Sequence, residues 1–133
     1  MNYILTATAN SGDFGGLTIK KSTIAFGTTE KSAKELPNPA ELFLGALASC
    51  ILKNVERFSD LLKFNYDKSS IKVIGIRLER PPRIDKIHYE LTIHSEDEQL
   101  KIPLLKKNIE KFGTIYNTVN LACGITGTIT KTI

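Results

Sequence analysis

Cysteine is scarce in this sequence, which has only Cys50 and Cys123 among its 133 residues. Two cysteines are too few for a disulfide framework, and in a reducing compartment we expect free thiols or redox groups instead. Long apolar runs are also missing, because the longest, 42–52, is well short of the ~20 residues that cross a bilayer. We therefore expect no membrane span. The N-terminus has no basic segment followed by an apolar core, so we expect no secretory signal and a cytoplasmic location.

Concentrated positive charge is absent as well. The formal net charge is only +4, and acidic residues are interleaved with the basic ones along the chain. Nucleic-acid binders usually gather lysine and arginine on one face, with aromatic platforms when they bind single strands. The hypothesis of a basic module that binds RNA or another polyanion is therefore supported only by the mild positive charge. We expect no nucleic-acid partner.

The sequence holds only two histidines, His88 and His94, and both fall on the polar face of an alternating strand pattern, 87–93. Six residues of extended chain separate them by roughly 20 Å, so they cannot share a metal ion. His88 and Glu90 could share one, but two ligands without a third are a weak signal. We predict no metal site and no cofactor.

The order of the segments predicts a single α+β domain over residues 1–133, since the length suits one domain and no internal repeat is present. Strand-like patterns predict an N-terminal β-hairpin, a second hairpin and a C-terminal strand. Helical periodicity predicts one long buried helix and two shorter ones. Strands grouped around helices, without regular βαβ alternation, favour a two-layer architecture. The expected strands are 3–9, 17–26, 71–80, 87–93 and 124–133, and the expected helices are 39–63, 103–112 and 114–122.

The long helix has the clearest local signals in the chain. Asn38 is a good N-cap, Pro39 suits the first helical position, and Glu41 sits where a capping-box carboxylate reaches back to the cap. Residues 42–52 are apolar or small on all sides, which indicates a helix enclosed by other structure. A helix over 39–63 would be roughly 37 Å long. Because a monomer of this size could not bury it alone, we predict an obligate homodimer.

This apolar helix carries Cys50, which we expect to be largely out of bulk water. A free cysteine in such a place is commonly a small packing residue. The other interpretation is a reactive thiol, which needs a cation or a hydrogen-bond donor close to the sulfur, because burial alone disfavours the thiolate. Sequence spacing does not show such a partner, so both interpretations stay open.

The run from Pro39 to Cys50, PAELFLGALASC, resembles the helix of the OsmC/Ohr family that ends on the peroxidatic cysteine, and the element order matches over nearly the whole chain. That family consists of small α+β thiol peroxidases that reduce organic hydroperoxides. The resemblance implies an intertwined dimer whose long helices pack together, with active sites at the dimer interface. It also implies Cys50 and Glu41 as the catalytic residues.

The sequence departs from the family pattern at several points. The resemblance predicts a second cysteine after the penultimate helix, and that position falls on Gly113. Cys123 comes ten residues later and looks like a strand residue instead. The resemblance also implies an arginine in the N-terminal hairpin, but the turn there contains Asp13 and no arginine. In the Ohr branch the glutamate directly follows the proline, where this chain has Ala40.

Two hypotheses of function follow. In the first, the protein is an OsmC-like redox protein that reduces organic hydroperoxides through Cys50, with Glu41 or Thr114 as a polar neighbour and an external thiol as reductant. In the second, it is a non-catalytic OsmC-like dimer that binds a small hydrophobic ligand at its interface. The sequence leaves enzyme activity open between them, and it identifies neither the peroxide nor the reductant.

Overall fold

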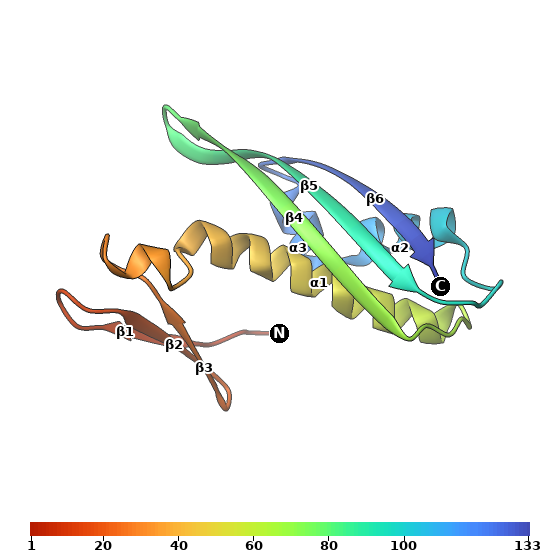
Figure 1. Ribbon diagram of the computed structural model, residues 1–133, viewed down its shortest axis with the longest axis horizontal. Helices are drawn as coiled ribbons and strands as arrows, with labels where there is room; N and C mark the ends of the chain where they lie inside the picture. Colours follow the sequence, from red (N-terminus) through yellow and green to blue (C-terminus); the bar gives the residue numbers. More distant parts are fainter. The chain divides into compact units, whose positions relative to one another are not determined.

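Two three-stranded sheets and three α-helices make up the fold, which confirms the predicted α+β class. Figure 1 shows the computed structural model, which describes residues 1–133. The chain divides into two units, Met1–Phe43 and Leu44–Ile133, and each contains one of the sheets. Helix α1 (Pro39–Leu61) begins in the first unit and continues through the second.

The first unit contains three antiparallel strands where the sequence predicted a hairpin of two. They are β1 (Thr6–Ala9), β2 (Gly15–Ile19) and β3 (Ser22–Phe26), in that order across the sheet. The expected strand 17–26 is broken by a tight turn in which Lys20 has a positive φ of 55°. Neither glycine nor asparagine marks this turn, and those are the residues that usually signal one.

Gly15 was expected in the first turn but lies in β2, opposite Phe26 of β3. A Cβ atom at Gly15 would overlap the ring of Phe26, so this position accepts only glycine without moving the ring. The loop that follows β3 contains a short 3-10 helix, η1 (Ser32–Lys34), and then reaches α1.

Helix α1 ends at Leu61, two residues earlier than expected. Lys63 adopts a left-handed conformation with a φ of 59°, and the amide of Phe64 donates to the carbonyl of Ser59 at 3.0 Å. A left-handed residue followed by such a bond back into the last turn is a common way for a helix to end.

Only one stripe of α1 is buried by the chain itself. Leu47, Ile51, Val55 and Phe58 are fully or almost fully buried in the core. Leu61, by contrast, is 58% exposed. The expectation that the helix would be enclosed on all sides is therefore met on one face only within a single chain.

The second unit holds β4 (Lys68–Glu79), β5 (Pro82–His94) and β6 (Gly124–Thr132). Strands β4 and β5 form the predicted antiparallel hairpin, and β6 pairs with β5 in parallel. A parallel pair needs a crossover between its strands. Here the crossover is made by α2 (Ile102–Phe112) and α3 (Thr114–Val119).

In this unit the helices cover one face of the sheet (Figure 1). Alternate residues of β5 point toward the helices and are buried, while His88 lies on the other face, as the alternation predicted. None of the helices combines the length and apolar content needed to span a bilayer. The buried core comprises Leu47, Ile51, Val55, Phe58, Phe64, Ile87, Tyr89, Leu91, Ile93, Leu100, Leu105, Ile109, Tyr116, Val119 and Cys123.

Candidate functional site

Cys50 lies in α1 beside the buried stripe and is itself only half-buried. Its neighbour in sequence, Ile51, is fully buried in the core. The cysteine therefore sits at the border of the core, where the backbone is fixed by packing and the residue is not fully enclosed. Such a position suits a reactive thiol better than one largely out of bulk water, which the sequence indicated.

Asn54 contacts both the backbone and the sulfur of Cys50. Its side-chain Nδ2 donates a hydrogen bond to the Cys50 carbonyl oxygen at 2.9 Å and lies 3.6 Å from Cys50 Sγ. Asn54 is only 8% exposed. Asn54 was not among the residues that the sequence predicted for the site, although residues four apart on a helix share a face and the spacing could have suggested it.

Gly113 joins α2 to α3 and lies directly against the Cys50 thiol. A Cβ atom at this position would be 3.2 Å from Cys50 Sγ, 3.1 Å from the carbonyl oxygen of Ile109 and 3.0 Å from the Cβ of Tyr116. The backbone of Gly113 is extended, with a φ of −74° that any residue can adopt. The position where the family resemblance places a second cysteine therefore faces Cys50 in space.

Glu41 has a clear structural role at the start of α1. The backbone N–H of Glu41 donates to the side-chain oxygen of Asn38 at 2.8 Å. In return, the backbone N–H of Asn38 donates to the Glu41 carboxylate at 3.0 Å. This is the predicted capping box. Cys50 follows nine residues later, which corresponds to two and a half turns, so the two side chains project from opposite sides of the helix. The hydrogen bonds of Glu41 are made to Asn38 and not to Cys50.

The remaining candidates, Cys123 and Thr114, have hydrogen-bond partners other than Cys50. Cys123 is buried, its thiol donates to the carbonyl oxygen of Ile84 at 3.2 Å, and both cysteines are free. Thr114 is exposed, and its carbonyl accepts a hydrogen bond from the Thr118 hydroxyl at 2.9 Å. Neither forms a hydrogen bond to Cys50.

A polar cluster fastens α2 to the sheet behind this site. The Tyr89 hydroxyl donates to Glu110 Oε2 at 2.6 Å, and Lys106 Nζ lies 2.7 Å from the same oxygen. Burial, together with the Glu110 carboxylate, raises the pKa of Tyr89 well above its usual range and that of Tyr116 to about 12. Gly127 on β6 leaves room for the Tyr89 ring, which a Cβ there would overlap. The cluster fixes the helix that leads to Gly113.

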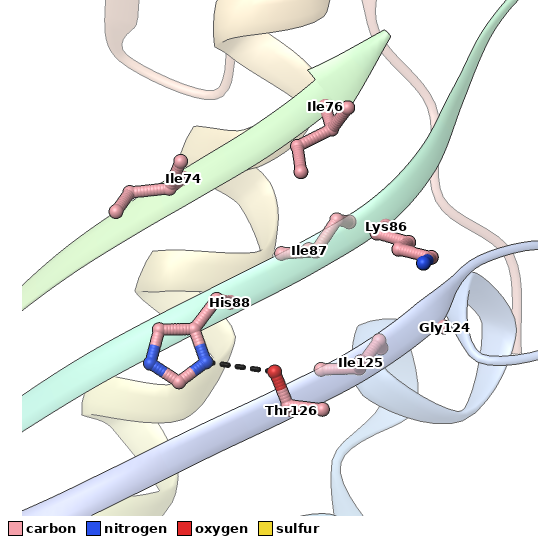
Figure 2. A pocket seen from close by; sticks show the side chains of 8 residues that line it. All are labelled: Ile74, Ile76, Lys86, Ile87, His88, Gly124, Ile125 and Thr126. Atoms are coloured by element: carbon pink, nitrogen blue, oxygen red, sulfur yellow. Dashed lines mark hydrogen bonds between the residues drawn. The ribbon is translucent and has the colours of Figure 1, made fainter. Parts of the chain in front are cut away.

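A separate hollow of about 390 Å³ lies on the outer face of the second sheet. Figure 2 shows Ile74 on β4 near His88 and Ile76 on the same strand nearer Lys86. The Nδ1 of His88 lies 2.7 Å from the Thr126 hydroxyl oxygen. Lys86 lies at the other end of the hollow. Cys50 does not line it. No group of three or more potential ligands among histidine, cysteine, aspartate and glutamate is placed to hold a metal ion.

In the second unit, helices cover one face of a sheet, and α1 carries a half-buried thiol. The Asn54 side-chain amide and the backbone of Gly113 both lie against this thiol. These features define a small α+β thiol protein. The sequence family described as OsmC-like protein matches residues 31–128 of the chain. The match covers most of the chain, so the protein belongs to the OsmC-like family. A comparison with curated proteins found no match.

Solved structures share the fold at low sequence identity. An OsmC-like protein from Mycoplasma pneumoniae is 19% identical with a TM-score of 0.88, over 100% of this chain and 99% of that one. The organic hydroperoxide resistance protein OsmC from Legionella pneumophila is 15% identical with a TM-score of 0.69, covering 96% and 97%. The organic hydroperoxide resistance protein OhrB of Bacillus subtilis is 16% identical with a TM-score of 0.63, covering 96% and 98%. These likenesses establish a shared fold.

Proposed function

We propose that this protein reduces organic hydroperoxides through Cys50 and restores the cysteine with an external thiol. It acts in the cytoplasm, where small thiols and thiol proteins are kept reduced. Membership of the OsmC-like family supports the proposal, and so do two structural relatives that are named for organic hydroperoxide resistance.

The observation that carries the proposal is the distance between position 113 and the Cys50 sulfur. The family resemblance places a second cysteine at Gly113, and a Cβ atom there would lie 3.2 Å from Cys50 Sγ. This proximity supports the alignment of Cys50 with the reacting cysteine of the family.

The chemistry has two stages. In the first, the Cys50 thiolate attacks the distal oxygen of the hydroperoxide, the O–O bond breaks, and the alcohol leaves after taking up a proton. The cysteine is thereby oxidised to a sulfenic acid, while the peroxide is reduced by two electrons. In the second, an external thiol attacks the sulfenic sulfur, forming a mixed disulfide and releasing water. A second external thiol then displaces the first as a disulfide and regenerates Cys50.

A homodimer is part of the proposal because α1 leaves apolar surface uncovered in one chain. Leu61 is 58% exposed, and Leu52 is only half-buried. Exposed apolar surface of this kind commonly marks an interface. Sedimentation of the purified protein at twice the mass of one chain is the expected result. Within this proposal Glu41 contributes through the helix cap, which fixes where α1 begins.

The test is to trap the sulfenic acid. Reduced protein is exposed to one equivalent of an organic hydroperoxide together with a nucleophile selective for sulfenic acids, and mass spectrometry locates the adduct. The adduct should appear on Cys50. Cys50→Ser should abolish it, while the matched variant Cys123→Ser should retain it, because the Cys123 thiol is bonded elsewhere. In a separate run with excess hydroperoxide and the same nucleophile, peroxide consumption should stop after one equivalent unless a small thiol is added.

Absence of an adduct after hours with excess hydroperoxide would contradict the proposal. Cys50 would then be a packing residue. The chain would instead be assigned to the second hypothesis, a non-catalytic dimer that binds a small hydrophobic ligand at its interface.

A further inference from the structure

Asn54 is one of only two buried polar residues in the protein, and its burial calls for an explanation. The other, Ser95, is explained by loop structure, since its hydroxyl donates to the Asn65 carbonyl at 2.5 Å and accepts from the Asp97 amide at 3.1 Å. Asn54 stands in the middle of a helix, where asparagine is a poor helix former. An apolar side chain would satisfy the same packing without burying an amide.

Both hydrogen-bond acceptors of the Asn54 amide belong to Cys50. The NH₂ group has two hydrogens. One goes to the Cys50 carbonyl oxygen at 2.9 Å, which fixes the plane of the amide. The second is then directed toward Cys50 Sγ, 3.6 Å from the nitrogen. The asparagine therefore presents a preorganised donor to the sulfur, on the same helix and held in place by the core.

Several charged groups on the surrounding helices, Arg57, Lys111 and Glu110, have contacts other than the Cys50 sulfur. The Arg57 guanidinium lies over the Phe112 ring at 6.0 Å, and Lys111 Nζ lies over the same ring at 5.3 Å. On α2, the carboxylate of Glu110 pairs with Lys106 at 2.7 Å. None of these groups forms a hydrogen bond to the thiol. Within the second unit, the side-chain amide of Asn54 is the one side-chain group that donates a hydrogen bond to the Cys50 sulfur.

We propose that Asn54 stabilises the Cys50 thiolate by donating a hydrogen bond to the sulfur, and so serves as a neutral substitute for a cation beside the reacting thiol. The inference rests on the proposed function, in which Cys50 reacts as a thiolate. It explains why a helix interior keeps a buried asparagine. A hydrogen bond to an anionic sulfur is stronger than one to the neutral thiol, because charge assistance strengthens such bonds.

The experiment measures how fast Cys50 is alkylated by iodoacetamide across pH 6 to 11, in a Cys123→Ser background so that one thiol is observed. Asn54→Leu removes the donor while keeping the branched shape and the number of side-chain heavy atoms. We expect alkylation at pH 7 to slow about tenfold, as loss of a hydrogen bond to a charged group implies. The whole pH–rate curve should move to higher pH and meet the parent curve where the thiol is fully ionised. Asn54→Asp keeps the shape but replaces the donor with an acceptor, and it should slow the reaction at least as much.

Asn108 provides a matched control. Its Nδ2 donates to the Leu104 carbonyl oxygen at 2.9 Å, which is the same four-residue side-chain bond on a helix without a cysteine. Asn108→Leu should leave the pH–rate curve of Cys50 unchanged. This variant separates the donor to sulfur from the ordinary effect of losing a side-chain bond to the backbone.

An unchanged pH–rate curve in folded Asn54→Leu would overturn the inference and leave Asn54 a purely structural role. If the leucine variant does not fold, the smaller Asn54→Ala, which removes the donor without adding a charge, decides the question by the same curve. Alkylation consumes no peroxide, so the result is independent of the sulfenic acid test. The failure of one proposal can therefore be distinguished from the failure of the other.

Discussion

Replacing Gly113 with cysteine should give Cys50 an internal partner and change the way its oxidised form is resolved. In a disulfide, the Cβ of one cysteine lies about 3.0 Å from the sulfur of the other, since the S–S bond is about 2.04 Å long. A Cβ atom at position 113 would lie 3.2 Å from Cys50 Sγ. The existing geometry therefore suits a disulfide with little movement of either backbone.

Two opposing contributions set the change in stability. Cys50 and position 113 are 63 residues apart, and closing a loop of that length stabilises a folded protein by about 4 kcal/mol in the chain-entropy account. Against this, the new Cβ lies 3.0 Å from the Tyr116 Cβ and 3.1 Å from the Ile109 carbonyl, and relieving that crowding costs roughly 1 to 2 kcal/mol. The oxidised variant should gain roughly 2 to 3 kcal/mol, or about 10 °C in melting temperature.

The assay combines mass spectrometry with thermal unfolding. One equivalent of organic hydroperoxide should convert the Gly113→Cys variant to a form with an internal disulfide between Cys50 and the introduced thiol, with loss of the trapped sulfenic adduct seen in the parent. The new thiol attacks the sulfenic sulfur and releases water. A dithiol should then regenerate the variant for repeated turnover. The melting temperature should be higher in the oxidised than in the reduced form.

Gly113→Ala is the control, because it introduces the same Cβ crowding without a thiol. It should be destabilised by roughly 1 to 2 kcal/mol and should keep the sulfenic adduct on Cys50. If a folded Gly113→Cys variant never forms the disulfide and retains the full sulfenic adduct, the proximity argument is refuted. The alignment of position 113 with the second cysteine of the family would then lose its structural support.

Three further outcomes test the rest of the structure. Cys123→Ser should keep peroxide reactivity and unfold within about 1 kcal/mol of the parent, because a serine hydroxyl can still donate to the Ile84 carbonyl; loss of reactivity would reassign Cys123. Gly127→Ala should destabilise the fold by roughly 2 to 3 kcal/mol in urea unfolding, since its Cβ would displace the buried Tyr89 ring; a neutral change would contradict the packing. Burial raises the pKa of Tyr89, and that of Tyr116 to about 12. An unfolded tyrosine ionises near 10, so stability should be complete below about pH 10 and fall as the pH rises toward 12. Urea midpoints that stay constant over this range would argue against buried, neutral tyrosines.

Local signals in the sequence predicted most elements of the fold. The start of α1 was predicted by Asn38 and Glu41, whose reciprocal hydrogen bonds the structure contains. The alternation along β5 predicted a half-buried strand, and Gly113 predicted the break between the last two helices. Such features depend on interactions between residues a few positions apart, so the sequence carries them directly.

The prediction of a hairpin at the N-terminus was wrong in detail for a local reason. The turn at Lys20 takes a positive φ without glycine or asparagine, and no residue type there distinguishes a turn from a continuing strand. Asn54 was missed for a different reason. Its four-residue spacing from Cys50 was visible, but an asparagine on a helix is usually solvated, and only the packed core shows that it is buried.

The sequence by itself determined the order of the elements, the capped helix and the presence of a single cysteine on it, because these depend on local spacing and residue type. Tertiary structure alone decided that Gly113, 63 residues beyond Cys50, lies against its sulfur, and that β6 pairs in parallel with β5. It also decided that the Tyr89 ring fits over Gly127. These contacts arise when helices pack onto a sheet in one register, and no short-range pattern encodes the distance between residues that meet only through that packing.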